Sequence, residues 1–339
     1  MVKILGREMQ PTGYGLMGLT TRAQGLSDDD GLACMQTAYE QGIKLWNGGE
    51  FYGPPNRNSL QLLNKCFTKH PEQANDIVLS VKGGNVPGGH VFDGSPKNIR
   101  RSIDECLRVL DGKKHLDLFE AARVDSKVPI EHTIATIAEY VKAGKVGGIS
   151  LSECSADSIR RAAKVHKIEC VEVELSLWET SILHNGVAKT CAELGIPIIA
   201  YSPLGRGFLT GQLKSPDDIL DNDFRKGIPR FQPGLFEKNL ELVRKVEKIA
   251  QKKGVTPGQI GMAWVVKQGS KPGMPAIIPI PGSSSPSRVK ENAYVPELTD
   301  AEEAEIDEIV RSADVQGDRY PAAVQAMNFG DSPALEEKA

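Results

Sequence analysis

Residues 95–122 read SPKNIRRSIDECLRVLDGKKHLDLFEAA, and this stretch leads from an amphipathic helix directly into a buried strand. Ser95 can cap the helix, and Pro96 suits its first turn because proline needs no hydrogen-bonded N–H there. The apolar face of the helix consists of Ile99, Ile103, Leu107 and Leu110. The run at 116–122 then has the length of a strand buried in a parallel sheet.

The same alternation of strand and helix extends along most of the chain. The expected strands lie at residues 12–17, 43–47, 77–82, 116–122, 148–151, 171–175, 197–202 and 276–280. Helical patterns separate them, beginning with the one that Ser27 opens. Strand and helix repeated eight times predict a closed (β/α)8 TIM barrel rather than an open sheet. We therefore expect one barrel domain over residues 1–339, with a lid-like insertion at 209–233 and a frayed polar tail at 331–339.

The composition of the chain limits the classes of molecule that it can be expected to bind. A net charge of −3 over 339 residues provides no general attraction for nucleic acid or a membrane surface. The sequence has no apolar run of membrane-spanning length and no apparent signal peptide. The six cysteines lack the spacing of a metal site, so we expect reduced core thiols and no metal. These features favour a cytoplasmic protein acting on a small molecule, and they leave its oligomeric state open.

Chemistry in a barrel of this kind is expected at the carboxyl ends of the strands. The second strand ends in WNGGEFYG at 46–53, and the third ends in SVKGG at 80–84, so Tyr52 and Lys82 can meet at the barrel mouth. An ammonium group beside a phenol favours the phenolate and lowers the pKa of the phenol. The alternative is that Tyr52 is an ordinary loop aromatic and Lys82 a surface charge.

Five segments in order carry a wider resemblance: WNGGEFYG, LSVKGG, DLFEAARVDSKVPIE, IPIIAYSPLGRGFLTG and IPIPGSSSPSRVKEN. With this order and spacing, the chain resembles the aldo-keto reductase superfamily from about residue 13 to 298. The combination of WN-x-GEFYG with DLF-x-x-ARVD resembles the fungal pyridoxal reductases of that superfamily. The resemblance implies an NADPH-dependent oxidoreductase that reduces pyridoxal to pyridoxine in vitamin B6 metabolism.

The resemblance also implies roles for residues at the mouth. Tyr52 matches the general acid, and Lys82 matches its partner. The chain departs from the superfamily at Asn47, where an Asp is usual, and at Ala122, where a His is usual. Asn47 would leave Lys82 without a neutralising charge, so that either the Tyr52 pKa falls further or Lys82 loses its proton more easily. Ala122 would leave space for a substituted pyridine ring. Trp46 and Trp178 could line that substrate pocket or serve in the core.

No GxGxxG motif follows a strand, so a Rossmann site is not indicated. The resemblance instead implies NADPH lying across the mouth, with Ser152 and Glu172 at the nicotinamide carboxamide and Tyr201 stacked on the ring. The expected contacts to the pyrophosphate are Ser202, Leu204, Gly205 and Gly211, from a glycine-rich turn. The expected contacts to the 2′-phosphate and the adenine are Gly282, Ser283, Ser285, Arg288, Glu291 and Asn292. Arg225 and Arg230 of the insertion would add positive charge, and Arg288 favours NADPH over NADH.

Two other functions stay open from the sequence. One is a broad-specificity aldehyde or aryl-alcohol oxidoreductase on the same scaffold, and the other is a non-catalytic NADPH-binding regulatory subunit. The direction of Arg123 is open too: beside Ala122 on a strand it should point out of the barrel, unless the strand has already ended.

Overall fold

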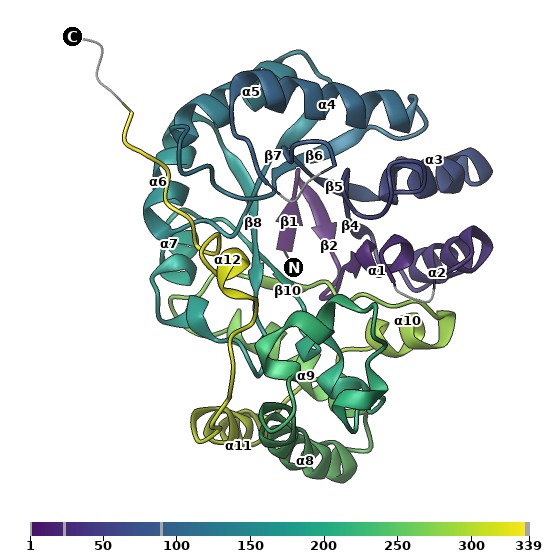
Figure 1. The fold of residues 1–339 in the computed structure, drawn as a ribbon, viewed down its shortest axis with the longest axis vertical. Helices are drawn as coiled ribbons and strands as arrows, with labels where there is room; N and C mark the ends of the chain where they lie inside the picture. Colours follow the sequence, from purple (N-terminus) through teal and green to yellow (C-terminus); the bar gives the residue numbers. More distant parts are fainter. Residues whose placement is uncertain (1, 23–24, 89–90, 336–339) are drawn as a thin grey trace.

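The computed structural model describes residues 2–22, 25–88 and 91–335. Eight parallel strands form one sheet with helices around it, as Figure 1 shows. They are β3 (Tyr14–Gly15), β4 (Leu45–Gly49), β5 (Val78–Gly83), β6 (Leu116–Ala121), β7 (Val146–Ser152), β8 (Ile168–Glu174), β9 (Ile198–Tyr201) and β10 (Ile277–Pro279). The sheet closes on itself, because the amides of Gly13 and Gly15 donate to the Pro279 and Pro281 carbonyls at 2.8 and 3.2 Å. The predicted TIM barrel is confirmed, and each predicted strand overlaps an observed one.

The helices surround the sheet, and several of them begin or end where the sequence predicts a cap or a stop. They are α1 (Met17–Thr20), α2 (Asp28–Glu40), α3 (Ser59–Lys69), α4 (Pro96–Leu110), α5 (Ile130–Lys142), α6 (Ala156–Val165), α7 (Val187–Glu193), α8 (Leu235–Lys253), α9 (Pro257–Gln268), α10 (Pro286–Ala293), α11 (Asp300–Arg311) and α12 (Ala322–Gln325). Ser27 and Ser95 cap α2 and α4 by accepting the amides of Asp30 and Asn98. All six cysteines are buried, and none of them forms a disulfide bond. Among the described helices, none has the length and apolar character needed to cross a bilayer.

A short N-terminal hairpin closes one end of the barrel, and the sequence patterns did not predict it. Its strands, β1 (Val2–Ile4) and β2 (Arg7–Met9), lie at the centre of the ring in Figure 1. Ile4 and Met9 pack with inward-facing apolar residues near the strand starts, including Leu45, Val78 and Leu118. The apolar plug leaves the opposite end, where the strands finish, as the place for polar chemistry.

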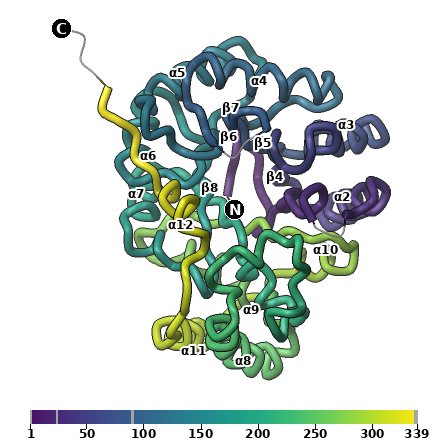
Figure 2. The backbone as a smooth tube through the Cα atoms, viewed as in Figure 1, coloured from purple at the N-terminus to yellow at the C-terminus, as the bar shows by residue number. Residues whose placement is uncertain are grey.

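Two irregular segments lie at that opposite end. The insertion after β9 folds into short 3-10 helices, η3 (Gly205–Thr210), η4 (Pro216–Asp218), η5 (Phe224–Gly227) and η6 (Pro229–Phe231). The chain after α11 returns past these turns and then runs beside α6, as the yellow tube in Figure 2 shows. Residues 331–333 of the predicted tail are held in place: Ser332 accepts the Ile130 amide at 3.1 Å, and Arg161 donates to the Pro333 carbonyl at 2.7 Å. Residues 336–339 lie outside the described residues.

Candidate active site

Alternation along the strands selects the side chains that enter the barrel. In the register of the sheet, Asn47 pairs with Ser80, Gly49 pairs with Lys82, and Lys82 pairs with Glu120. Side chains at paired positions of neighbouring parallel strands share a face, so these polar groups gather inside the barrel near its mouth.

Lys82 is the centre of this buried polar group. Its ammonium forms ion pairs with Glu120 at 3.0 Å and with Glu172 at 2.5 Å, and it donates to the Asn47 amide oxygen at 3.0 Å. The Asn47 amide nitrogen donates to both carboxylates, at 2.9 Å to Glu120 and 2.6 Å to Glu172. Ser80 donates to Glu120 at 2.8 Å. We call Lys82, Asn47, Ser80, Glu120 and Glu172 the lysine cluster.

The expectation that Asn47 leaves Lys82 without a neutralising charge is wrong. Two carboxylates from β6 and β8 replace the one that is absent from β4. Burial alone would lower the pKa of Lys82, but Glu120 and Glu172 raise it above its ordinary value, so the ammonium keeps its proton. An amide at position 47 suits this arrangement because it donates to both carboxylates, whereas a third carboxylate would repel them.

This arrangement of charges shifts the pKa of Glu172 as well. Burial and the neighbouring Glu120 raise the pKa of Glu172 to about 8, although the Lys82 ammonium opposes the shift. Both oxygens of Glu172 are engaged, one by Lys82 and one by Asn47. Glu172 therefore belongs to the lysine cluster and is not simply available to a nicotinamide carboxamide, the role that the resemblance implied for it.

Sequence reasoning missed Glu120, although a signal for it was present. Glu120 lies two residues after Leu118 and two before Ala122 in the strand of 116–122. The two-residue period of a strand puts all three on one face, and a barrel interior does not keep a carboxylate without a partner.

Tyr52 reaches the mouth just above the lysine cluster. The Lys82 nitrogen lies 5.9 Å from the centre of the Tyr52 ring. The ring covers Gly49, where an added Cβ would come within 2.9 Å of the ring carbons. Thr20 donates to the Tyr52 carbonyl at 2.7 Å and the Ser59 amide does so at 3.0 Å, which fixes the loop. The Tyr52 ring and the Lys82 ammonium group thus lie near each other at the mouth.

The pKa of Tyr52 is raised, not lowered as the sequence led us to expect. Burial is the largest cause; the Lys82 charge opposes it, and Glu172 and Glu120 add to it. Because burial outweighs the effect of the ammonium, the pKa of the phenol stays above its ordinary value and Tyr52 remains protonated at neutral pH. A protonated phenol is able to act as a general acid.

A second buried charged group lies beside the expected nicotinamide position, next to Ser152 and Tyr201. The Tyr201 hydroxyl donates to Glu153 at 2.8 Å and lies 3.1 Å from the Tyr320 hydroxyl. Arg319 forms ion pairs with Glu153 at 2.6 Å and with Glu174 at 3.3 Å. Burial raises the pKa of Glu153, but Arg319 outweighs burial and holds it below its ordinary value. Tyr201 is thereby fixed at the mouth by contacts at its hydroxyl.

The predicted phosphate and adenine residues lie on one side of the mouth, on the insertion and α10. Arg288 donates to the Thr210 carbonyl at 3.0 Å and pairs with Glu291 at 2.8 Å, so it joins the insertion to α10. Ser285 caps α10 by accepting the Arg288 amide, and Asn292 is buried in the same helix. The remaining predicted residues of this set are Ser202, Leu204, Gly205, Gly211, Gly282 and Ser283, all in the turns beside them. Arg225 and Arg230 are already paired with Asp223 and Glu179.

These residues fit a dinucleotide. The Ser152 hydroxyl is buried without a hydrogen-bond partner among the described residues, beside Glu172 in the register of β7 and β8. Such a group requires a ligand or water as partner. Gly211, at positive φ, has open space where a side chain would project, and at Gly282 an added Cβ would meet only the Gly15 carbonyl, at 3.5 Å. No group of three or more His, Cys, Asp and Glu side chains in the described part of the chain could hold a metal ion.

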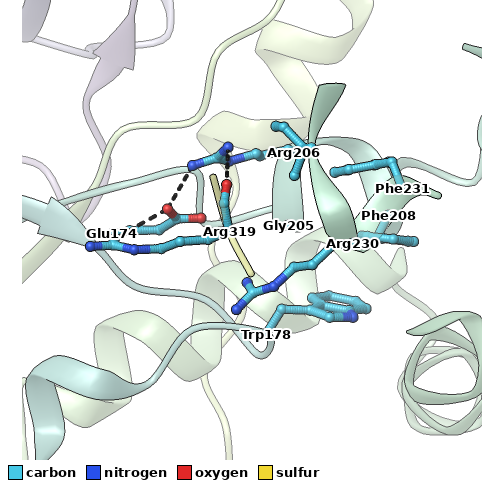
Figure 3. A pocket seen from close by; sticks show the side chains of 9 residues that line it. Glu174, Trp178, Gly205, Arg206, Phe208, Arg230, Phe231 and Arg319 are labelled. Carbon is cyan, nitrogen blue, oxygen red and sulfur yellow. Dashed lines mark hydrogen bonds and ion pairs between the residues drawn. The ribbon is translucent and has the colours of Figure 1, made fainter. Parts of the chain in front are cut away.

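The three residues that were predicted to line the substrate pocket lie in different places in the structure. Trp46 points out of the barrel and stacks on Phe67 with ring centres 5.9 Å apart, so a role in lining the substrate pocket does not fit it. Ala122 is buried where β6 ends. Trp178 stacks on Phe208 with ring centres 5.1 Å apart and lines a small pocket, which Figure 3 shows together with Glu174, Arg206 and Arg319.

The chain is similar to known proteins both in sequence and in fold. The model of the aldo/keto reductase family matches residues 11–311. The probable pyridoxal reductase 2 of Schizosaccharomyces pombe is 42% identical over 295 residues, covering 85% of this chain and 86% of that protein. The putative pyridoxal reductase of Saccharomyces cerevisiae is 40% identical over 338 residues, covering 92% and 96%.

Two further matches are informative. The aldo-keto reductase yakc [NADP(+)] of Schizosaccharomyces pombe is 37% identical over 340 residues, covering 98% of this chain and 97% of that protein. Among solved structures, the glycerol dehydrogenase of Gluconobacter oxydans superposes with a TM-score of 0.79 at 22% identity, covering 93% and 96% of the two chains. At that identity the superposition supports the barrel fold alone.

Proposed function

The chain belongs to the aldo/keto reductase family and is therefore an oxidoreductase that uses a nicotinamide cofactor, and we propose that it reduces pyridoxal to pyridoxine with NADPH. The observation that carries the proposal is the Lys82 ammonium 5.9 Å from the Tyr52 ring, at the open end of a barrel plugged at its other end. The names of the two yeast relatives support pyridoxal as the substrate.

Each group at the mouth has a place in this reaction. NADPH, when bound, supplies the hydride to the aldehyde carbon. Tyr52 gives its proton to the aldehyde oxygen, for which its protonated state at neutral pH is required. The nearby Lys82 charge then stabilises the phenolate that remains, while Glu120 and Glu172 keep Lys82 protonated and fixed.

The proposed preference for NADPH rests on Arg288. Arg288 lies in the first turn of α10, which Ser285 caps, and a guanidinium recognises phosphate through paired N–H donors. We propose that this corner holds the 2′-phosphate of NADPH and that Ser152 binds the carboxamide. Insertion 209–233 would act as a lid over the pyrophosphate, anchored through the bond between Arg288 and the Thr210 carbonyl.

The experiment compares pyridoxal with simple aldehydes while the absorbance of the reduced nicotinamide is followed. Turnover highest on pyridoxal supports the proposal, and equal turnover across the aldehydes favours a broad-specificity reductase. Tyr52→Phe is expected to lower kcat by about 100-fold or more with NADPH affinity unchanged, because only the proton donor is removed. Tyr140→Phe is the matched control, since Tyr140 lies on α5 and bonds to Asp104. Full activity of Tyr52→Phe would show that the proton donor is another group.

A further inference from the structure

Glu50 is a buried carboxylate in the loop that carries Tyr52, two residues before the phenol, and the proposed reaction assigns it no role. Its side chain is only 8% exposed, whereas most carboxylates of a folded protein are solvated. A carboxylate at that depth is costly unless several donors satisfy it. The donors that satisfy Glu50 therefore show which parts of the molecule its burial holds together.

Two contacts of Glu50 go to the end of β5, on either side of Gly83. Regular pairing of β4 with β5 ends at Gly49 and Lys82. Beyond that point, the Glu50 amide donates to the Lys82 carbonyl at 2.9 Å, and the Glu50 carboxylate accepts the Gly84 amide at 3.0 Å. The loop that carries Tyr52 is thus bonded directly to the strand that carries Lys82.

Helix α4 supports the same carboxylate. The Ser102 hydroxyl donates to Glu50 Oε1 at 2.7 Å and accepts the Gly84 amide at 2.8 Å. Arg101 forms an ion pair with Glu50 Oε1 at 3.1 Å and donates to the Asn85 carbonyl at 2.7 Å. Three donors therefore converge on Oε1, and together they fix the side chain of Glu50 against the end of β5.

The main chain between Glu50 and α3 is fixed as well. The Glu50 carbonyl accepts the side-chain amide of Asn58 at 2.8 Å, and Asn58 caps α3 by accepting the Leu60 amide at 2.9 Å. The loop at 50–58 is therefore attached at one end to β5 and at the other to α3. Tyr52 lies between these two attachments.

We propose that Glu50 is a positioning residue, which fixes the Tyr52 loop to the end of β5 and so sets where the Tyr52 ring lies relative to the Lys82 ammonium. The inference rests on the proposed function, because proton transfer by Tyr52 beside Lys82 is part of that function. The contact with the Gly84 amide needs an acceptor oxygen at the end of a side chain of this length. The ion pair with Arg101 involves the same oxygen, but Arg101 is partly exposed, so we expect the pair to contribute less.

The test separates the length of the side chain from its charge. Glu50→Ala removes the acceptor and is expected to lower kcat on pyridoxal roughly 10- to 100-fold, since a small displacement of a catalytic group is costly. Glu50→Asp keeps the charge but is too short to reach the Gly84 amide, and it should lower kcat by about 10-fold. Glu50→Gln keeps the acceptor without the charge, so its kcat should stay within about threefold of the parent. Glu105→Ala, at an exposed pair with Arg108 on α4, is the matched control and should leave kcat unchanged.

Binding of NADPH distinguishes positioning from a general loss of structure. Fluorescence titration should give an NADPH affinity within about twofold of the parent for all the Glu50 variants, because the residues proposed to bind the cofactor lie on other elements. Urea unfolding of each variant identifies the ones that are folded. If Glu50→Ala does not fold, the contrast between Glu50→Asp and Glu50→Gln decides the inference.

Amide hydrogen exchange, read by mass spectrometry, tests the attachment without turnover. The amides of Glu50 and Gly84 are both hydrogen-bonded in the parent, and fragments that contain them should exchange faster in Glu50→Ala and Glu50→Asp but not in Glu50→Gln. If the chain reduces no aldehyde, the proposed function fails, and the exchange rates still decide whether Glu50 fastens the loop. Full activity of Glu50→Ala, equal losses in Glu50→Asp and Glu50→Gln, a parallel loss of NADPH affinity, or unchanged exchange would overturn the inference.

Discussion

At the scale of single residues, the notable feature is a lysine held between two glutamates inside the barrel. The pKa values of the lysine cluster follow from competition between burial and charge. Burial disfavours every charged form, and the single ammonium compensates for only part of two carboxylates. Burial and the remaining negative charge together raise the pKa of Glu172. They also raise the pKa of Tyr52, which therefore keeps its proton.

This raised pKa of Glu172, about 8, predicts how stability depends on pH. Between the ordinary glutamate pKa and about 8, the folded state binds a proton that the unfolded state has lost. The free energy of unfolding should therefore fall as pH rises through this range, by at most about 1.4 kcal/mol per pH unit from this group. Glu172→Gln should remove this part of the slope in urea unfolding at several pH values from 5.5 to 8.5. Glu193→Gln, at an exposed pair with Arg160, is the control, and identical slopes in parent and Glu172→Gln would refute the assignment.

At the scale of elements, the end of β4 positions Tyr52, the proposed general acid. Gly48 and Gly49 are adjacent, but they face opposite sides of the sheet. An added Cβ at Gly49 would lie 2.9 to 3.1 Å from three atoms of the Tyr52 ring, whereas at Gly48 the nearest atoms, on Leu63 and Ser59, are at 3.4 Å. The glycine at 49 is thus needed for the Tyr52 ring to lie flat against the strand end.

We therefore predict different effects for two neighbouring alanine substitutions. Gly49→Ala should displace the Tyr52 ring and lower kcat about 10- to 100-fold, since small displacements of a catalytic group are costly. NADPH affinity should stay within about twofold, because the residues proposed to bind the cofactor lie on other elements. Gly48→Ala, in ordinary contact on the outer face, should keep most of the activity. Steady-state kinetics with fluorescence titration of NADPH measures both, and a fully active Gly49→Ala would contradict this account of β4.

At the scale of the whole molecule, the chain after α11 is fastened to the strand ends by Arg319. This side chain is 2% exposed, pairs with Glu153 and Glu174, and lies 4.7 Å over the ring of Phe329. Farther along, the Gly330 amide donates to the Glu153 carbonyl at 2.8 Å. The last part of the chain therefore belongs to the wall of the candidate site, next to Tyr201.

Removal of this link should weaken the fold and release the segment together. Arg319→Gln leaves Glu153 without its buried counter-ion, and loss of one partner from a buried pair costs about 3–5 kcal/mol. We expect a lower urea midpoint and faster protease cleavage after residue 311, read from fragment masses. Arg311→Gln, at an exposed pair with Glu308, should behave as the parent. An unchanged midpoint with an intact C-terminal segment would show that Arg319 contributes little.

The sequence by itself determined the barrel and its eight strands, and it predicted that Tyr52 and Lys82 lie near each other at the mouth. These follow from local patterns: strand and helix periods are read within a few residues, and both groups stand at strand ends, which meet at one rim. The tertiary structure alone decided what surrounds them. Glu120 and Glu172 come from separate strands, and their distance from Lys82 depends on sheet register and closure, which no local pattern encodes. The outward stacking of Trp46 likewise depended on the presence of Phe67, which comes from a separate helix.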